Sequence, residues 1–157
     1  MDTRSIRFWN RDFAGGNLPE KLLTHRGLVY PWQCDHMGHM NVMWYVGKFD
    51  EATWAFFATL GLTPAYLRAA DRGMVAVEQT IKYKRELLAG DVLTVHSEAL
   101  EIKDKSLRFS HEMRNEETGE VVATTELVGV HIDTKLRKAC SIPQSVRELV
   151  LGKLSGV

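Results

Sequence analysis

The segment from Val42 to Leu60 constrains the fold of this chain more than any other part of the sequence. Apolar side chains recur along it at helical spacing, and large aromatic side chains occupy the remaining faces. The first set comprises Val46, Phe49, Thr53, Phe56 and Leu60, and the second comprises Trp44, Tyr45, Trp54 and Phe57. A helix that is apolar on nearly every face must be covered by other elements. The sequence therefore predicts a long helix that ends before Gly61 and is surrounded by the rest of the fold.

After this helix and a short second one, from Thr63 to about Gly73, the sequence pattern changes to alternation. Alternating apolar and polar residues are typical of half-buried strands. We expect strands over 75–86, 92–102, 107–114 and 121–133, after a first strand over 23–29 and before a closing helix over 143–151. Short turns such as Ala89-Gly90-Asp91 connect the later strands, so consecutive strands should pair in the antiparallel direction.

One buried helix and a long antiparallel sheet leave few possible arrangements. The simplest is an α+β fold in which the sheet curls around the helix. A curled sheet in a single chain has a free edge and an open end, and pairing of two subunits at that edge would protect both. We therefore expect a homodimer, or a homotetramer built as a dimer of dimers.

Length, charge and cysteine content exclude several classes of protein. A chain of 157 residues suits one domain, over 23–157, preceded by a poorly specified arm over 1–22. Twenty basic and 20 acidic residues give no net field to attract nucleic acid or an anionic membrane. No leader-like start or spanning apolar stretch is found, so we expect a cytoplasmic protein. Cys34 and Cys140 lie far apart, which argues against a disulfide framework or a zinc site.

The segment over 32–41, Trp-Gln-Cys-Asp-His-Met-Gly-His-Met-Asn, carries the chemistry of this sequence. It places a carboxylate, two imidazoles, a glycine and an amide in a tight connection just before the long helix. The start of a helix offers unpaired backbone N–H groups and the positive end of the helix dipole, which both stabilise developing negative charge. This arrangement suits a site that handles an acyl group.

The same residues resemble a known family. The motif Asp35-x-x-Gly38-His39-x-Asn41, followed by Tyr45 and then Phe49-Asp50-Glu51-Ala52, resembles the hotdog-fold acyl-CoA thioesterases of the 4-hydroxybenzoyl-CoA thioesterase type. The similarity covers about residues 23–145, through Leu60-Gly61-Leu62, the segment 75–83, Gly90-Asp91 and Asp133. It implies a long central helix wrapped by a curved antiparallel sheet. It also implies hydrolysis of an acyl-CoA to free acid and CoA in a tunnel at the subunit interface, without metal or cofactor.

The resemblance also implies roles for the motif residues. Asp35 matches the catalytic carboxylate, as nucleophile or as general base for water, and both chemistries suit a carboxylate beside a thioester. His39 and Asn41 would orient groups or bond the thioester carbonyl. Backbone N–H groups around Asn41, Val42 and Met43 would form an oxyanion hole, Gly38 would allow close approach or a positive φ, and Tyr45 would line the pocket.

Coenzyme A requires contacts to its phosphates, and two basic clusters could supply them. One is Lys82, Lys84 and Arg85, and the other is Lys103, Lys105 and Arg108. Lysines at strand edges also protect against aggregation, so this assignment has a structural alternative.

Several motif residues have plainer explanations that the sequence leaves open. Asp35 and Asn41 are good turn and helix-capping residues, and His39 is equally compatible with a buried structural role. Glu51 and Glu78 are second candidates for a catalytic carboxylate, although solvated surface positions explain them well. Trp32, Trp44 and Trp54 beside Tyr45 could form an aromatic surface for a flat or cationic acyl group, or simply pack in the core.

Two other functions use the same fold. One is a module that binds acyl-CoA as a sensor without hydrolysing it, and the other is an enzyme that hydrates an enoyl thioester or dehydrates a hydroxyacyl thioester. The candidate carboxylate and the lack of a DNA-binding segment argue against the sensor, and the motif resembles a different branch from the hydratases. The sequence therefore favours a thioesterase, with the acyl group left open.

Overall fold

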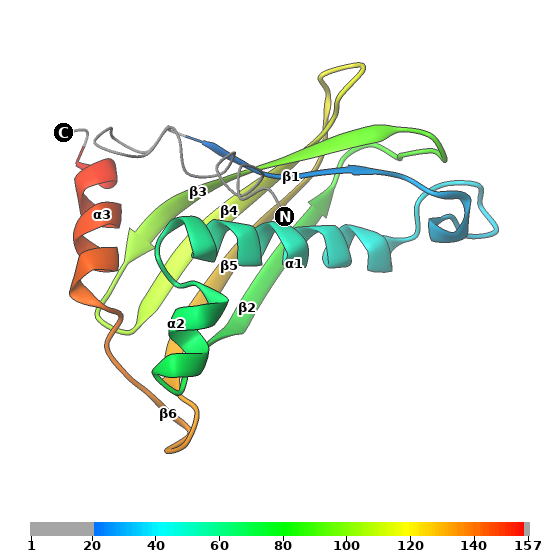
Figure 1. Cartoon of the computed structure of the whole chain (residues 1–157). Coiled ribbons are helices and arrows are strands. Elements are labelled where there is room, and N and C mark those ends of the chain that lie inside the picture. The colour runs from blue at the N-terminus through cyan, green and yellow to red at the C-terminus, as the bar shows by residue number, and fades with distance from the viewer. Residues whose placement is uncertain (1–20, 156–157) are drawn as a thin grey trace, which may run out of the picture.

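The computed structural model describes residues 21–155, which form one curved antiparallel sheet with a long helix against it (Figure 1). The sheet order is β1-β3-β4-β5-β2, and β6 pairs with β5. The strands are β1 (Leu22–Leu28), β2 (Arg72–Tyr83), β3 (Val92–Ile102), β4 (Ser106–Asn115), β5 (Val121–Asp133) and β6 (Lys138–Ala139). The helices are α1 (Val42–Thr59), α2 (Pro64–Ala69) and α3 (Gln144–Leu154), with a 3-10 turn, η2, at Pro31–Gln33.

This architecture confirms the predicted α+β fold with a long central helix against a curved antiparallel sheet (Figure 1). The predicted arm over 1–22 lies almost entirely outside the described residues. None of the helices within 21–155 is long and apolar enough to cross a membrane.

Local hydrogen bonds explain where the helices begin and end. The side chain of Asn41 caps α1 by accepting the N–H of Met43, and Gly61 follows the helix with a φ of +96°. Thr63 caps α2 in the same way. The second helix ends at Ala69 rather than near Gly73, because Asp71 adopts a left-handed φ of 53° that turns the chain directly into β2.

Strand β2 also ends earlier than predicted, at Tyr83 rather than at Glu86. The N–H groups of Lys84 and Arg85 both donate to the carbonyl of Val122, so the regular ladder to β5 stops there. Residues 84–86 therefore leave the alternating pattern of the strand, and this change has consequences for the candidate site.

The core between α1 and the sheet consists of two clusters. One gathers around Phe56, Phe57 and Phe109 and includes residues of α3, such as Val146 and Val150. The other gathers around the N-terminal half of α1, at Tyr45, Phe49 and Ala52, and includes Leu93, Val95 and Met113 from the sheet. Phe49 is completely buried, as expected for the predicted stripe.

The far side of α1 is open, which differs from the prediction that the rest of the chain surrounds the helix. Met43 is 62% exposed, Trp54 is 42% exposed and Val46 is 40% exposed. The sheet of one chain covers only one side of the helix, because β2 is its last strand and the described part of the chain provides nothing beyond that edge. An apolar helix face of this kind indicates an interaction surface.

A chain of polar side chains runs through the core under α1. Thr24 on β1 contacts Ser97 on β3 at 2.6 Å, Ser97 contacts Nδ1 of His111 on β4 at 2.6 Å, and Nε2 of His111 contacts Thr53 on α1 at 2.8 Å. Its ends reach the carbonyls of Val95 and Phe49. Because each group in the chain has partners, four buried polar residues are accommodated between the helix and the sheet.

Burial lowers the pKa of His111 to about 3, so this imidazole is neutral in the folded protein. Since the unfolded chain takes up a proton near the ordinary histidine value and the folded chain does not, stability is lost as pH falls from about 6.5 to about 3. We expect His111→Gln to reduce the pH dependence of the unfolding free energy by about 1.4 kcal/mol per pH unit in this window. Urea unfolding at several pH values checks this. If the unfolding free energy changed equally with pH in the native protein and in His111→Gln, this prediction would be wrong.

Candidate active site

The motif loop is a tight turn that backbone hydrogen bonds close on both sides. Cys34 and Met40 form an isolated antiparallel bridge, and the N–H of Asp35 donates to the carbonyl of His39 at 3.0 Å. Gly38 has a φ of +86° and donates its N–H back to the carbonyl of Asp35. A positive φ of this size favours glycine, so Gly38 serves the backbone conformation of the turn.

The carboxylate of Asp35 is held at both oxygens. Oδ1 accepts the backbone N–H of Met37 at 2.9 Å, and Oδ2 accepts the side-chain amide of Asn41 at 3.0 Å. These hydrogen bonds, the Met37 N–H first, hold the pKa of Asp35 below its ordinary value, with a smaller contribution from the nearby imidazoles. The side chain is 22% exposed. Asp35 is therefore an oriented, ionised carboxylate that solvent can still reach.

Asn41 connects this carboxylate to the long helix. Its Oδ1 accepts the N–H of Met43 as the helix cap, while its Nδ2 donates to Asp35. Its own backbone N–H donates to the carbonyl of Gln33 at 2.9 Å. One amide side chain thus fixes the start of α1 and the position of the carboxylate together.

His39 lies between two carboxylates. Its Nδ1 contacts Oε2 of Glu86 at 2.9 Å, and its Nε2 lies 3.8 Å from Oδ1 of Asp35. The side chain is 34% exposed, so the structure places His39 at the surface of the loop. No sequence motif marks Glu86 as a site residue, because its contact with His39 depends on how the segment after β2 folds back against the motif loop.

The N-terminus of α1 offers fewer free donors than the sequence suggested. The N–H of Asn41 donates to Gln33 and the N–H of Met43 donates to the Asn41 side chain. Within residues 21–155, the N–H of Val42 has no hydrogen-bond acceptor. Val42 is therefore the donor at the helix start that remains available to a ligand.

A hollow of about 290 Å³ lies beside these residues. Its lining combines the motif loop, the start of α1 and the end of β2, namely His39, Met40, Val42, Tyr45, Tyr83, Lys84, Arg85 and Glu86. Tyr45 is buried, its ring packs edge-on against Tyr83, and its hydroxyl donates to the carbonyl of Arg85 at 3.2 Å. Burial raises the pKa of Tyr45 to about 12, so its hydroxyl stays protonated at neutral pH.

A second cavity, of about 410 Å³, lies along the open side of α1 and is bounded by β2, β4 and β5. Met43, the residue after Val42, belongs to its lining, so the first turn of the helix contributes to both spaces. Trp54, Phe57 and Phe109 also contribute to it. Of the two alternatives for the tryptophans, a single aromatic surface does not form, because Trp32 stacks on Tyr30 with ring centroids 4.3 Å apart. Core packing does not account for Trp32 and Trp54 either, since they are 67% and 42% exposed.

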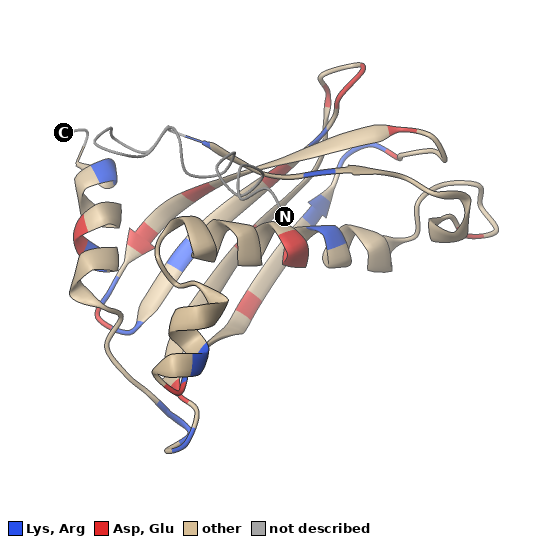
Figure 2. Ribbon diagram, in the orientation of Figure 1, with Lys and Arg blue, Asp and Glu red and all other residues tan. Residues whose placement is uncertain are grey.

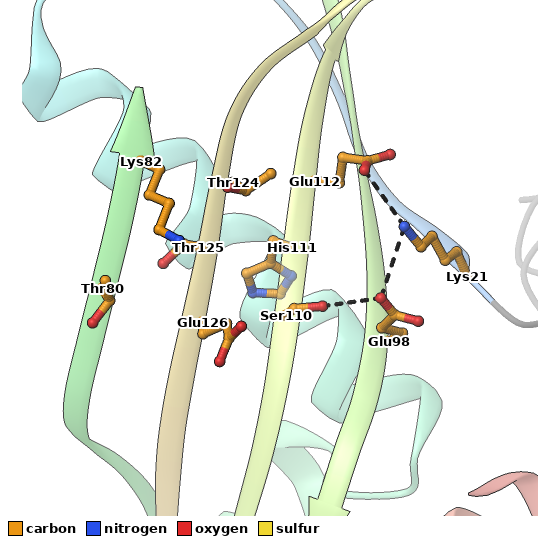
Figure 3. Close-up of a pocket in the computed structure, with 10 residues that line it drawn as sticks. All are labelled: Lys21, Thr80, Lys82, Glu98, Ser110, His111, Glu112, Thr124, Thr125 and Glu126. Atoms are coloured by element: carbon orange, nitrogen blue, oxygen red, sulfur yellow. Dashed lines mark hydrogen bonds and ion pairs between the residues drawn. The ribbon is translucent and has the colours of Figure 1, made fainter. Parts of the chain in front are cut away.

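A third hollow, of about 380 Å³, is polar and involves different strands (Figure 3). Lys82 lines it together with Thr80, Glu98, Ser110, Glu112 and Glu126 (Figure 3). Lys82 is therefore separated from Lys84 and Arg85, which line the hollow at the motif loop. The structure divides the first predicted basic cluster between two sites.

The second predicted basic cluster lies at the other end of the sheet, at the turn between β3 and β4 and beyond it (Figure 2). Lys103 pairs with Glu101 at 3.5 Å, and Arg108 pairs with Glu126 at 2.9 Å. Ile102 of that turn pairs with Leu107, whereas the end of β2 near Lys84 lies beside Ala123. The two clusters therefore do not form one phosphate-binding surface within a single chain.

The two other candidate carboxylates lie away from the motif loop. Glu51 is exposed on α1 and lies 3.3 Å from Nε2 of His25 on β1. Glu78 is exposed on β2 and lines a small hollow with Arg108. Within residues 21–155 no group of three or more His, Cys, Asp or Glu side chains is arranged to hold a metal ion.

A sequence model of the thioesterase-like superfamily matches residues 29–150, which include the motif loop, α1 and the whole of β2 to β5. The chain belongs to the thioesterase-like superfamily. This match confirms the resemblance that the motif suggested.

Individual members of this superfamily agree with the assignment. The L-carnitine dehydrogenase/betainyl-CoA thioesterase of Agrobacterium fabrum is 36% identical over 125 residues, which are 80% of this chain and 25% of the relative. The long-chain acyl-CoA thioesterase FadM of Escherichia coli is 29% identical, over 76% of this chain and 90% of FadM. The solved structure of a gentisyl-coenzyme A thioesterase is 28% identical with a TM-score of 0.69, covering 81% of this chain and 98% of that one.

The lengths of these relatives differ. This chain spans about a quarter of the length of the relatives that combine a dehydrogenase with a thioesterase. It spans most of the length of FadM and of the gentisyl-coenzyme A thioesterase.

The double role of Asn41 can be separated by two substitutions. We expect Asn41→Ala to remove the cap of α1 and lower the unfolding free energy by about 1 kcal/mol. It should also raise the pKa of Asp35, because the carboxylate loses a donor. Asn41→Asp should keep the cap but raise the pKa of Asp35 further, because it places a second carboxylate beside the first. Denaturant unfolding and NMR titration of the Asp35 carboxyl measure the two effects. A pKa of Asp35 that is unchanged in both variants would rule out this role for the amide.

Proposed function

We propose that this chain hydrolyses acyl-CoA thioesters to a free acid and coenzyme A, with Asp35 as nucleophile or general base. The observation that carries the proposal is the coupling of an oriented carboxylate to the start of α1 through Asn41, beside a hollow lined by Val42. Membership of the thioesterase-like superfamily supports the reaction class. Relatives named as thioesterases, whose similarity covers most of this chain, support it as well.

The geometry suits both roles of Asp35, since each begins with an ionised carboxylate. As a nucleophile, an Asp35 oxygen attacks the thioester carbon, the C–S bond breaks with its electron pair on sulfur, and water hydrolyses the mixed anhydride. As a general base, Asp35 takes a proton from water, whose oxygen attacks the same carbon, and CoA leaves with a proton as the free thiol. Water is the co-reactant in both routes.

The start of α1 would stabilise the negative charge that develops on the thioester oxygen. The N–H of Val42 is free to donate, and the positive end of the helix dipole lies at the same place. His39, held by Glu86, would keep a hydrogen-bonding group beside Asp35 and fix the loop. Lys84 and Arg85 line the same hollow, so we assign them to the phosphates of CoA in preference to Lys82.

The test is release of free thiol from a panel of acyl-CoAs. We expect Asp35→Asn to lower turnover of the best substrate by about a thousandfold or more, because the amide neither attacks a thioester nor takes a proton from water. Asp133→Asn is the matched control. Asp133 is also a turn carboxylate that accepts two backbone N–H groups, but it pairs with Arg72 at the other end of β2.

Full turnover by Asp35→Asn would overturn the assignment of Asp35. Tight binding of acyl-CoA by the native protein, with no thiol released on long incubation, would instead support the acyl-CoA sensor. Calorimetry measures acyl-CoA binding by the native protein and by Asp35→Asn. A variant that binds acyl-CoA is folded, so its loss of turnover is not a failure to fold.

The proposed enzyme is a homodimer that forms at β2. Within the described residues this strand pairs with β5 alone, and Val77 on it is 61% exposed. The open side of α1, with Met43, Val46 and Trp54, lies against the same edge of the sheet (Figure 1). Pairing of two β2 strands would continue the sheet and bring a second copy over both apolar surfaces.

Sedimentation velocity tests this arrangement. We expect the native chain to sediment as a dimer or a dimer of dimers, and Val77→Glu to sediment as a monomer, because like charges would meet at the paired edge. Leu136→Glu is the control, since Leu136 is 70% exposed but lies at the turn between β5 and β6. A monomeric native chain, or a Val77→Glu variant that stays dimeric, would contradict the model.

The relatives differ in the acyl group for which they are named. The relatives are named for betainyl-CoA, for long-chain acyl-CoA and for gentisyl-coenzyme A, which are a cationic, an aliphatic and an aromatic acyl group. A short cationic acyl group is one candidate on this basis, and the cavity along α1 gives independent information.

A further inference from the structure

The cavity along the open side of α1 has an unusual combination of side chains. Most of its lining is apolar or aromatic, including Met43, Trp54, Phe57, Met74 and Phe109. Trp54 and Phe57 meet edge to face with ring centroids 5.8 Å apart, and Phe57 meets Phe109 in the same way at 5.2 Å. Among the residues that the structure describes, Asp50 is the only charged one that lines it.

Asp50 has no counter-ion in the described part of the chain. No ion pair or hydrogen bond joins its carboxylate to another residue in 21–155, although most other acidic side chains near the helix and sheet are paired. Its neighbour on the helix, Glu51, lies on a different face and contacts His25. Asp50 is exposed in the single chain, so water solvates its carboxylate there. Once a second subunit covers the cavity, a carboxylate beside it is costly unless a positive charge accompanies it.

Asp50 and Trp54 are four residues apart on α1, which places them one above the other on the same side of the helix. Trp54 is 42% exposed, so part of its ring is available to a ligand. Aromatic faces attract quaternary ammonium groups, which cannot donate hydrogen bonds and are recognised by ring electrons and by nearby negative charge. A carboxylate and a tryptophan at one cavity wall match those two requirements.

We propose that this cavity receives an acyl group ending in a quaternary ammonium ion, with Asp50 and Trp54 as the residues that determine this specificity. The inference rests on the proposed thioesterase function, because it assumes that the thioester lies at the start of α1. It adds the chemical class of the acyl group and the residues that select it.

The positions along the helix are consistent with one substrate spanning both sites. Asp50 follows Val42 by eight residues, which is about 12 Å along the axis of an α-helix. Side chains on a helix lean toward its N-terminus, so the Asp50 carboxylate is directed back toward the thioester position. A carbonyl at Val42 and a cationic group about six to eight carbons further along the acyl chain therefore fit on the same side of the helix.

A purely aliphatic acyl group would leave the Asp50 carboxylate without a positive partner once the proposed dimer covers the cavity. The competing explanation is that a basic side chain of the partner subunit neutralises Asp50. In that case Asp50 would contribute to dimer stability and would not distinguish charged from neutral substrates.

The experiment compares pairs of acyl-CoAs that have the same shape and differ in charge. γ-Trimethylammoniobutyryl-CoA and an acyl-CoA that carries a trimethylammonium group at the end of a chain of about eight carbons are each paired with the analogue in which carbon replaces nitrogen. We expect the native enzyme to favour the cationic member of at least one pair by about tenfold or more in kcat/KM, the range expected for a cation held by an aromatic ring and a carboxylate.

Asp50→Asn should abolish most of this preference by raising KM for the cationic substrate, while turnover of the neutral analogue stays the same or improves. Trp54→Phe should retain more of the preference than Trp54→Leu, because phenylalanine keeps an aromatic face. Glu51→Gln is the matched control, since it removes the same charge from the adjacent position of α1 but faces His25, and it should keep the preference.

Equal kcat/KM for the charged and neutral members of both pairs in the native enzyme would overturn this inference and leave the thioesterase function intact. A preference that survives Asp50→Asn would overturn the role of Asp50. Loss of the dimer in Asp50→Asn, measured by sedimentation, together with unchanged selectivity, would favour the partner's basic side chain. Failure of the proposed function itself would appear as no thiol release from any acyl-CoA in the panel.

Discussion

The two hydrogen bonds of the Asn41 side chain are the interactions on which the candidate site depends. Its oxygen fixes the first turn of α1, and its nitrogen fixes the Asp35 carboxylate. A reacting carboxylate and the N–H group that would bind the thioester oxygen must keep a constant separation. Here a single amide joins the candidate carboxylate to the start of α1, and the turn at Gly38 closes the loop with a hydrogen bond from its N–H to the carbonyl of Asp35.

The open side of α1 gives the molecule both its cavity and its expected interface. A helix with apolar side chains on nearly every face cannot be covered by the sheet of one chain, because the sheet ends at β2. The space that remains along Met43, Asp50 and Trp54 is large enough for an acyl group. A second subunit over this side would close the space and exclude water, which strengthens any charge interaction inside it.

The histidines show how environment decides the role of one residue type. His111 is surrounded by Phe49, Phe56 and Phe109 and bonded to Ser97 and Thr53, so burial keeps it neutral and it ties the helix to the sheet. His39 lies at the surface between two carboxylates, Glu86 and Asp35. Burial and a full set of partners make His111 a structural residue, whereas His39 lines a hollow that a ligand can enter.

The sequence by itself determined the features that depend on neighbouring residues. The span of α1, its cap at Asn41, the turn at Gly38 and the alternating strands follow from periodicity and from hydrogen bonds over a few residues. For the same reason the sequence placed Asp35 next to the start of the helix. These interactions are local, and a short segment contains all the partners they need.

Only the tertiary structure decided which distant side chains meet. The end of β2 at Tyr83 breaks the alternation, so Lys82 lies in one hollow while Lys84 and Arg85 lie in another. The pairing of Glu86 with His39 and the position of the exposed Asp50 at the wall of a largely apolar cavity depend on how the sheet curves and where it stops. Contacts between residues far apart in the chain arise from strand register and packing, and no pattern within a short segment contains that information.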